Sequence, residues 1–97
     1  MAKQVKWSKA AVTDRIEILD YWFLETGNKK YSKKLDKAFR ETISLLSKFP
    51  EMGRVLEGRE ERYFVKENYR IFYLIKNDSI EILRIWDSRR NPEDLNI

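Results

Sequence analysis

The stretch Tyr69–Asp87, YRIFYLIKNDSIEILRIWD, consists of two apolar runs separated by the turn residues Asn77 and Asp78. Both runs are rich in β-branched and aromatic residues, and each has the length of an ordinary strand. The stretch therefore predicts a β-hairpin, whose register follows if Asn77 and Asp78 form a two-residue turn. The predicted cross-strand pairs are Lys76 with Ser79, Ile75 with Ile80, Tyr73 with Ile82, Ile71 with Arg84, and Tyr69 with Trp86.

Both faces of this hairpin are largely apolar. Successive side chains of a strand point to opposite faces, so the pairs from Ile75–Ile80 onward share one face. The other face is then expected to hold Arg70, Phe72, Leu74, Glu81, Leu83 and Ile85. Strands that are apolar on both sides belong at the centre of a sheet, with helices on at least one face.

The residues before the hairpin add another strand and a loop. Arg62–Lys66 has strand composition, and Glu67 and Asn68 form a tight turn after it. We therefore expect strands over residues 62–66, 69–76 and 79–87 in an antiparallel meander. The segment 49–61, punctuated by proline and glycine and then polar, is expected to be a loop.

The first half of the chain predicts a short strand and two helices. Gln4–Trp7 alternates polar and apolar residues, and Ser8 can cap a helix over 9–25. Gly27 ends that helix, and a second helix follows over 29–48, before Pro50. Because the connection is short, the helices are expected to be antiparallel neighbours.

Apolar spacing assigns a buried side to the first helix. The expected buried positions are Val12, Ile16, Leu19 and Phe23, with Ala11, Ile18 and Trp22 beside them. The expected solvent side carries Asp14, Glu17 and Asp20.

The second helix has an apolar side and a cationic side. Its apolar side is expected to hold Tyr31, Leu35, Ala38, Phe39, Thr42, Leu45, Leu46 and Phe49. The cationic side carries Lys29, Lys30, Lys33, Lys34, Lys37 and Arg40. Such a stripe is more often a solvated face than a nucleic-acid contact, although a small nucleic-acid-binding module is one hypothesis that it supports.

This order of elements predicts one α+β domain over residues 1–97, with an N-terminal strand and with the helical hairpin packed on an antiparallel sheet in two layers. A chain of 97 residues, 42% hydrophobic and 13% aromatic, can bury one modest core although 37% of its residues are charged. Two independent domains would not fit.

Composition excludes several kinds of site. The chain has no cysteine and no histidine, so disulfides, thiolate metal sites and imidazole bases are excluded, and we expect neither a metal nor a cofactor. No apolar segment approaches membrane-spanning length, and a cytoplasmic protein without a membrane partner is the simplest expectation. The net charge of +4 suits nucleic acid or an acidic protein partner equally.

Two arginines follow the last predicted strand. Arg89 and Arg90 come just after Asp87, where the apolar run ends. Guanidinium groups are suited to phosphate or carboxylate, so the pair suggests an anionic partner. Alternatively, they are a solvated tail, or Asp87 pairs with one of them and makes the pair partly structural.

The chain resembles the RelE/ParE superfamily of toxins from bacterial toxin–antitoxin modules over almost its whole length. The resemblance rests on the order and spacing of several short motifs. These are Val5-Lys6-Trp7-Ser8 with Ala11, Asp14 and Ile18, Tyr21, the loop with Pro50, Gly53 and Arg54, the strand residues Tyr69, Arg70, Ile71 and Tyr73, and the closing Arg89-Arg90-Asn91-Pro92.

The resemblance implies a toxin that inhibits bacterial growth and is neutralised by a cognate antitoxin. RelE-like members cut messenger RNA on the ribosome, whereas ParE-like members poison DNA gyrase without being nucleases. If this chain is a nuclease, the resemblance implies that Arg70, Arg89, Arg90 and Lys66 stabilise the phosphate charge. A homodimer and a hetero-oligomer with the antitoxin both stay open.

The tail after Arg90 lacks the His or Tyr that ribosome-dependent members often carry there. Glu57, Glu60 or Glu61 could replace it as a base if their loop folds over the sheet, although solvated loop carboxylates are more common. The helical hairpin and the Pro50 loop favour the ParE-like branch. On that interpretation, Arg84, Trp86, Arg89 and Arg90 contact the target or the antitoxin.

Overall fold

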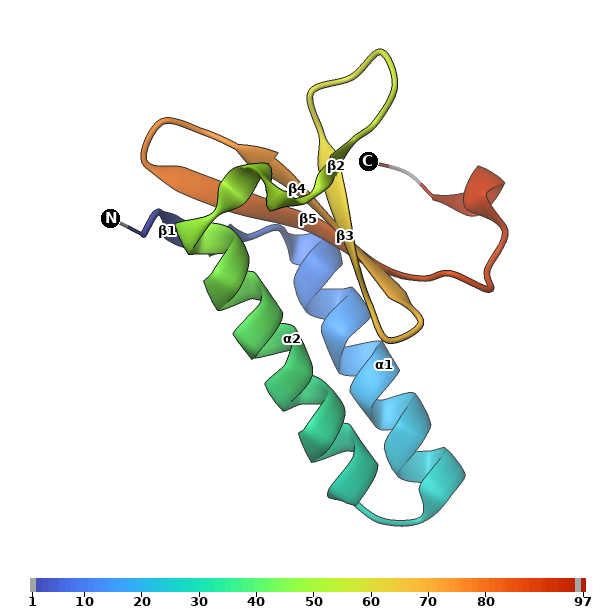
Figure 1. The fold of residues 1–97 in the computed structure, drawn as a ribbon. Helices are drawn as coiled ribbons and strands as arrows, with labels where there is room; N and C mark the ends of the chain where they lie inside the picture. Colours follow the sequence, from blue (N-terminus) through green and yellow to red (C-terminus); the bar gives the residue numbers. More distant parts are fainter. Residues whose placement is uncertain (1, 96) are drawn as a thin grey trace.

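The computed structural model describes residues 2–95 and 97 and contains two helices on one side of a five-stranded sheet (Figure 1). The elements are β1 (Gln4–Trp7), α1 (Lys9–Thr26), α2 (Lys30–Lys48), β2 (Arg54–Val55), β3 (Arg62–Lys66), β4 (Tyr69–Ile75) and β5 (Ser79–Asp87), with single 3₁₀ turns at Pro50–Met52 and Pro92–Asp94. This order confirms the predicted two-layer α+β fold. Within the described residues, neither helix is long and apolar enough to cross a membrane.

The sheet has the strand order β1-β5-β4-β3-β2. Its last three long strands form the predicted antiparallel meander, whereas β1 runs parallel to β5 and makes the sheet mixed. The short β2 lies in a segment that was predicted to be a loop. It consists of only two residues, which pair with Arg62 and Tyr63, and so short a strand leaves no periodic pattern in the sequence.

The hairpin register is as predicted near the turn and wrong beyond it. Ile75 pairs with Ile80 and Tyr73 with Ile82, but a β-bulge then leaves Leu83 as an extra residue, and Phe72 pairs with Arg84. Ile71 therefore faces Ile85 instead of Arg84, and Tyr69 faces Asp87 instead of Trp86. A bulge exchanges the faces of all residues that follow it on its strand. It moves Ile85 into the core and turns Trp86 to the opposite face.

The core lies between α2 and the sheet. Fully buried side chains from α2, β4 and β5 form it together with Ala11 of α1, namely Leu35, Phe39, Ile43, Leu46, Tyr69, Ile71, Tyr73, Ile80, Ile82 and Ile85. Most of the α2 face was predicted correctly, but Leu45 and Phe49 near the C-terminal end are exposed, and the buried Ile43 was missed. Replacing buried apolar side chains here should be costly, since each contributes both transfer free energy and packing.

The predicted buried face of α1 is only partly correct. Val12, Ile16 and Phe23 are exposed, while Asp14 is only 6% exposed. Ala11, Ile18, Leu19 and Trp22 do pack on the core, so the helix is rotated relative to the expectation. The cause is that α1 carries apolar residues on two sides, and periodicity alone could not tell which side the sheet covers.

The loop after α2 is held by one buried tyrosine. The Tyr73 hydroxyl accepts a hydrogen bond from the Gly53 N–H at 2.9 Å and donates one to the Pro50 carbonyl at 2.6 Å. Burial raises the pKa of this phenol, which keeps it protonated and able to donate. Gly53 is needed because a Cβ there would lie against the ring of Tyr73.

Candidate functional site

The sheet has a face that the helices do not cover. Because Tyr69, Ile71 and Tyr73 belong to the core, the alternating residues Arg70 and Phe72 of β4 point to the opposite side. We call this side the open face. The bulge in β5 places Trp86 there, directly beside Arg70 on the neighbouring strand.

Two arginine side chains contact the ring of Trp86. The guanidinium carbon of Arg90 is 4.2 Å from the centre of the Trp86 ring, and that of Arg84 is 5.3 Å from it. Both distances fit cation–π contacts, and the indole is only 3% exposed. Its Nε1–H has no hydrogen-bond partner among the described residues. Arg84, Trp86 and Arg90, three of the predicted contact residues, thus form one cluster.

Arg84 also has a structural role. Its guanidinium donates two hydrogen bonds to the Asp14 carboxylate, at 2.7 and 2.9 Å. The same carboxylate accepts the Ile85 N–H at 3.0 Å. Asp14 therefore fastens α1 to β5 where the bulge interrupts the ladder. Sequence reasoning missed this pair, because it assigned Asp14 to the solvent side.

Arg89 is paired within its own turn. Its guanidinium donates to both carboxylate oxygens of Asp87, at 3.0 and 2.8 Å, which confirms that Asp87 pairs with one of the two closing arginines. Side-chain hydrogen bonds from Arg89 hold the pKa of Asp87 below its usual value, so the carboxylate stays charged at neutral pH. Arg89 is exposed, but some of its guanidinium N–H donors are already used in the contact with Asp87.

Arg70 lies against a second aromatic ring on the open face. Its guanidinium carbon is 5.0 Å from the centre of the Tyr63 ring. Next to it is a shallow hollow of about 430 Å³, lined by Met52, Arg54, Tyr63, Phe64, Val65 and Arg70. None of the described residues that line this hollow is a carboxylate. Of the three candidate bases, Glu61 accepts hydrogen bonds from Arg59 instead.

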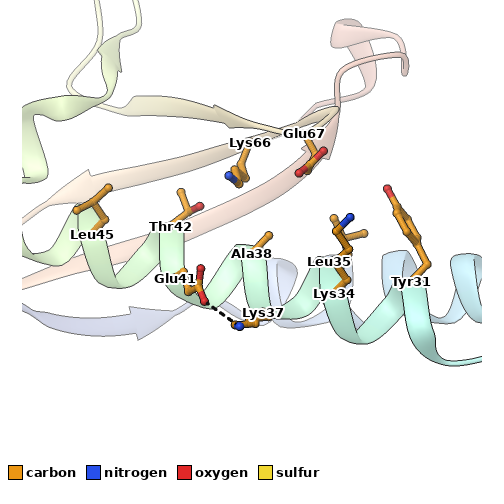
Figure 2. A pocket seen from close by; sticks show the side chains of 10 residues that line it. All are labelled: Tyr31, Lys34, Leu35, Lys37, Ala38, Glu41, Thr42, Leu45, Lys66 and Glu67. Atoms are coloured by element: carbon orange, nitrogen blue, oxygen red, sulfur yellow. Dashed lines mark ion pairs between the residues drawn. The ribbon is translucent and has the colours of Figure 1, made fainter.

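Lys66 is separated from the other three predicted catalytic residues. It pairs with Tyr69 across β3 and β4 and therefore points to the helical side of the sheet, away from Arg70. Figure 2 shows Lys66 above α2. The structure thus brings Arg84, Trp86 and Arg90 together, places Arg70 and Arg89 nearby, and puts Lys66 on the other face.

Lys66 lines a groove between α2 and the end of β3, drawn in Figure 2. The groove measures about 440 Å³, and its walls combine apolar side chains with lysines and glutamates, namely Tyr31, Lys34, Leu35, Lys37, Ala38, Glu41, Thr42, Leu45, Lys66 and Glu67. In the part of the chain that the structure describes, β2 pairs only with Arg62 and Tyr63, so the outer edge of residues 64–66 carries no strand. Sequence reasoning did not find this groove.

Comparisons with known proteins agree on the fold. A structure of the chromosomal ParDE toxin–antitoxin system from P. aeruginosa matches with a TM-score of 0.76 and 22% sequence identity, covering 89% of this chain and 96% of the matched one. A chain of the toxin–antitoxin complex RelBE2 from Mycobacterium tuberculosis matches with a TM-score of 0.67 and 18% identity, covering 90% and 99%. No curated protein matches significantly.

Sequence comparison identifies the family. The family described as the ParE toxin of the type II toxin–antitoxin system parDE matches residues 5–92, which is nearly the whole chain. The matched region includes Asp14, the Gly53 loop, Arg70 and the two closing arginines, so it contains both the structural pair and the open face. The chain belongs to the ParE toxin family of type II toxin–antitoxin systems.

Proposed function

We propose that this toxin acts in the cytoplasm by binding DNA gyrase, without cleaving nucleic acid, and that a cognate antitoxin neutralises it. The observation that carries the proposal is the composition of the hollow beside Arg70. Strand scission would need a group that accepts a proton from the ribose hydroxyl near neutral pH. The chain has no histidine, and among the described residues no carboxylate lines that hollow. Asp14, Glu17 and Asp87 line a separate hollow beside Arg89 and Arg90, where Arg84 binds Asp14 and Arg89 binds Asp87.

The separation of the cationic residues supports the same conclusion. Stabilising a phosphorane-like transition state requires several donors aimed at one point. Lys66 points away from Arg70, and Arg89 already donates to Asp87. Such an arrangement suits a broad binding surface better than a catalytic pocket.

The proposed contact surface is the cluster of Arg84, Trp86 and Arg90, with Arg89 at its border. Tryptophan and arginine dominate the binding energy of many protein interfaces. Arg90 is exposed at the end of β5, so it can contact a partner without rearrangement of the fold. The Trp86 ring makes cation–π contacts with both Arg84 and Arg90, and these contacts help to hold Arg90 in place.

Supercoiling assays with purified toxin and gyrase test the proposal. We expect inhibition, and we expect Arg90→Ala to raise the toxin concentration needed by about tenfold, the effect of losing roughly 1.4 kcal/mol of binding energy. Lys48→Ala, an exposed cation at the end of α2, is the matched control and should change little. In cells, the toxin should induce the DNA-damage response and leave messages intact. Cut messages together with normal supercoiling would refute gyrase binding.

A second candidate function is ribosome-dependent cleavage of messenger RNA, which the stacking of Arg70 on Tyr63 favours. Exposed arginines and aromatic rings on a sheet face are a common platform for single-stranded RNA. Primer extension on translated messages should then show cuts in the ribosomal A site that disappear in Arg70→Ala. Intact messages during growth arrest would exclude this function.

We further propose that the antitoxin occupies the groove between α2 and β3. An extended segment could pair with the free edge of residues 64–66 and place its apolar side chains against Leu45 and Ala38. Lys34 and Lys66 would then favour acidic residues in that segment, whereas Lys37 is already paired with Glu41. Leu45→Asp is expected to weaken antitoxin binding at least tenfold in calorimetry. Leu24→Asp, at an exposed leucine of α1, is the control, and equal losses in both variants would refute the assignment.

A further inference from the structure

Trp86 belongs to the proposed contact surface, yet a partner cannot reach its ring in the structure as it stands. The side chain is only 3% exposed, and so is that of Phe72 on the same face of the sheet. Neither α1 nor α2 lies on this side (Figure 1). Tyr63 packs against Phe72, and Arg84 and Arg90 contact Trp86. A contact residue that is buried to this degree becomes available only if part of the cover on the open face moves.

The segment that follows β5 runs along the open face. At its start, the Ser88 N–H donates to the Asn68 carbonyl, in the turn between β3 and β4, at 2.8 Å. At its other end, the Arg59 guanidinium donates to the main-chain oxygen of Ile97 at 3.3 Å. Arg59 lies in the loop between β2 and β3, which is at the opposite end of β3 from that turn. Figure 1 shows the segment on the side of the sheet away from both helices. We call residues 91–95 and Ile97 the strap.

The strap has an apolar side and an acidic side. Leu95 and Ile97 are partly buried, whereas Glu93 and Asp94 are exposed. Apolar side chains are buried where they leave water, and for a segment that crosses a sheet this happens on the side that faces the sheet. The apolar side of the strap therefore faces the protein, and its two carboxylates face solvent above the open face.

The strap can open without disturbing the sheet. β5 ends at Asp87, and the described residues of the strap form no strand of the sheet. Its 3₁₀ turn is closed from within, because Asn91 accepts the N–H of Glu93 on its side chain and the N–H of Asp94 on its carbonyl. Segments that lie outside the strand ladder and expose their hydrogen bonds open locally, at a lower free energy than the whole domain.

The Trp86 ring carries a polar group that the closed arrangement leaves unused. Its Nε1–H is buried and has no hydrogen-bond partner among the described residues. A buried donor without an acceptor is unfavourable, because it has lost water and gained nothing in exchange. Opening of the strap would let water or a carbonyl oxygen of a partner accept this hydrogen bond. The unused donor therefore favours opening and lies within the proposed contact surface.

We propose that the strap is a releasable cover of the open face, which the target must displace before it contacts Phe72 and Trp86. This regulation rests on the proposed function, in which Trp86 contacts the target. Arg90 is exposed and is available for the first contact while the strap is still closed. Glu93 and Asp94 act in the same direction as the cover, since the closed strap places carboxylates over a face whose contact residues are arginines and so weakens its attraction for an acidic partner.

Solvent exchange of the tryptophan ring N–H groups, measured by NMR, tests the cover without any partner. Leu95→Asp should favour the open strap and speed the exchange of the Trp86 Nε1–H by about tenfold or more. The Trp22 Nε1–H, which donates to the Tyr69 hydroxyl at 2.8 Å on the helical side of the sheet, is the internal reference and should stay unchanged. Leu24→Asp, at a leucine that is 79% exposed, is the matched control. Unchanged exchange of the Trp86 Nε1–H in Leu95→Asp would overturn the proposal.

A cross-link tests whether the strap must open for the target. The chain has no cysteine, so Arg59→Cys with Ile97→Cys supplies one pair of thiols that a cleavable bismaleimide linker can join. The linked toxin should inhibit gyrase supercoiling only at about tenfold higher concentration or more, and cleavage of the linker should restore the inhibition. Equal inhibition by the linked and cleaved forms would overturn the strap while leaving gyrase binding intact. If the unsubstituted toxin does not inhibit gyrase either, the proposed function fails, and the exchange of the Trp86 Nε1–H decides the strap by itself.

Discussion

Replacing Asp14 by alanine should lower the free energy of unfolding by about 3 kcal/mol. The carboxylate is almost fully buried and accepts two hydrogen bonds from the Arg84 guanidinium and one from the Ile85 N–H. Removing one member of a buried ion pair typically costs about 3–5 kcal/mol, and we count the Ile85 N–H that loses its acceptor within that range. We take the low end because the Arg84 side chain is 16% exposed and keeps its contact with the Trp86 ring.

Thermal and urea denaturation followed by circular dichroism measure this loss. For a domain of this size, about 3 kcal/mol corresponds to a melting temperature lower by about 12–24 °C. Glu17→Ala, one turn along the same helix and exposed, is the matched control and should change stability by less than about 0.5 kcal/mol. The double change Asp14→Leu with Arg84→Met should recover most of the loss, because apolar replacements avoid the desolvation of both charges. A loss below about 1 kcal/mol for Asp14→Ala would refute the anchoring role.

Three further predictions concern the loop, an ion pair and the core. Gly53→Ala should lower the free energy of unfolding by about 1–3 kcal/mol, because its Cβ would lie against the Tyr73 ring, and Tyr73→Phe should lower it by about 1–2 kcal/mol. In a double-mutant cycle measured by denaturant unfolding, the combined loss should be smaller than the sum of the two, and strict additivity would contradict the contact. The pKa of Asp36 is lowered, chiefly by its hydrogen bonds from Arg15, so its stabilising contribution is complete above the unfolded pKa of about 3.9 and is lost as the pH falls below it; NMR titration should show a higher Asp36 pKa in Arg15→Ala. Leu46→Ala, at a fully buried position, should cost about 2–5 kcal/mol, while Leu45→Ala, next to it and 42% exposed, should cost clearly less in the same urea titration; equal losses would mean that the face of α2 is misassigned.

The sequence was sufficient for the elements and for most of the fold. Strand and helix boundaries followed from local signals that act within a few residues, such as the Ser8 cap, Gly27 in the left-handed conformation and the Asn77-Asp78 turn. The register was correct as far as Tyr73 for the same reason. The bulge at Leu83 has no such local signal, because the run from Ile80 to Trp86 is apolar throughout except at Glu81 and Arg84.

The bulge also decided how much of the site was predictable. Without it, Trp86 would share the core face with Tyr69, and Arg70 would have no aromatic neighbour on β5. The residue types of the candidate surface were identified from the sequence, but their grouping depends on one unpaired residue in a strand. The position of Lys66, in contrast, does not depend on the bulge. Once Lys66 is known to pair with Tyr69, ordinary alternation along β3 places its side chain on the helical side of the sheet.

The partial misassignment of α1 has a physical reason. Burial is decided by which side of a helix finds a partner, and α1 offers two apolar sides to one sheet. Asp14 resolves the choice, because its carboxylate can be buried only where Arg84 and the Ile85 N–H meet it, and that contact turns Ile16 outward. The buried ion pair and the exposure of Val12, Ile16 and Phe23 are therefore two consequences of one helix rotation.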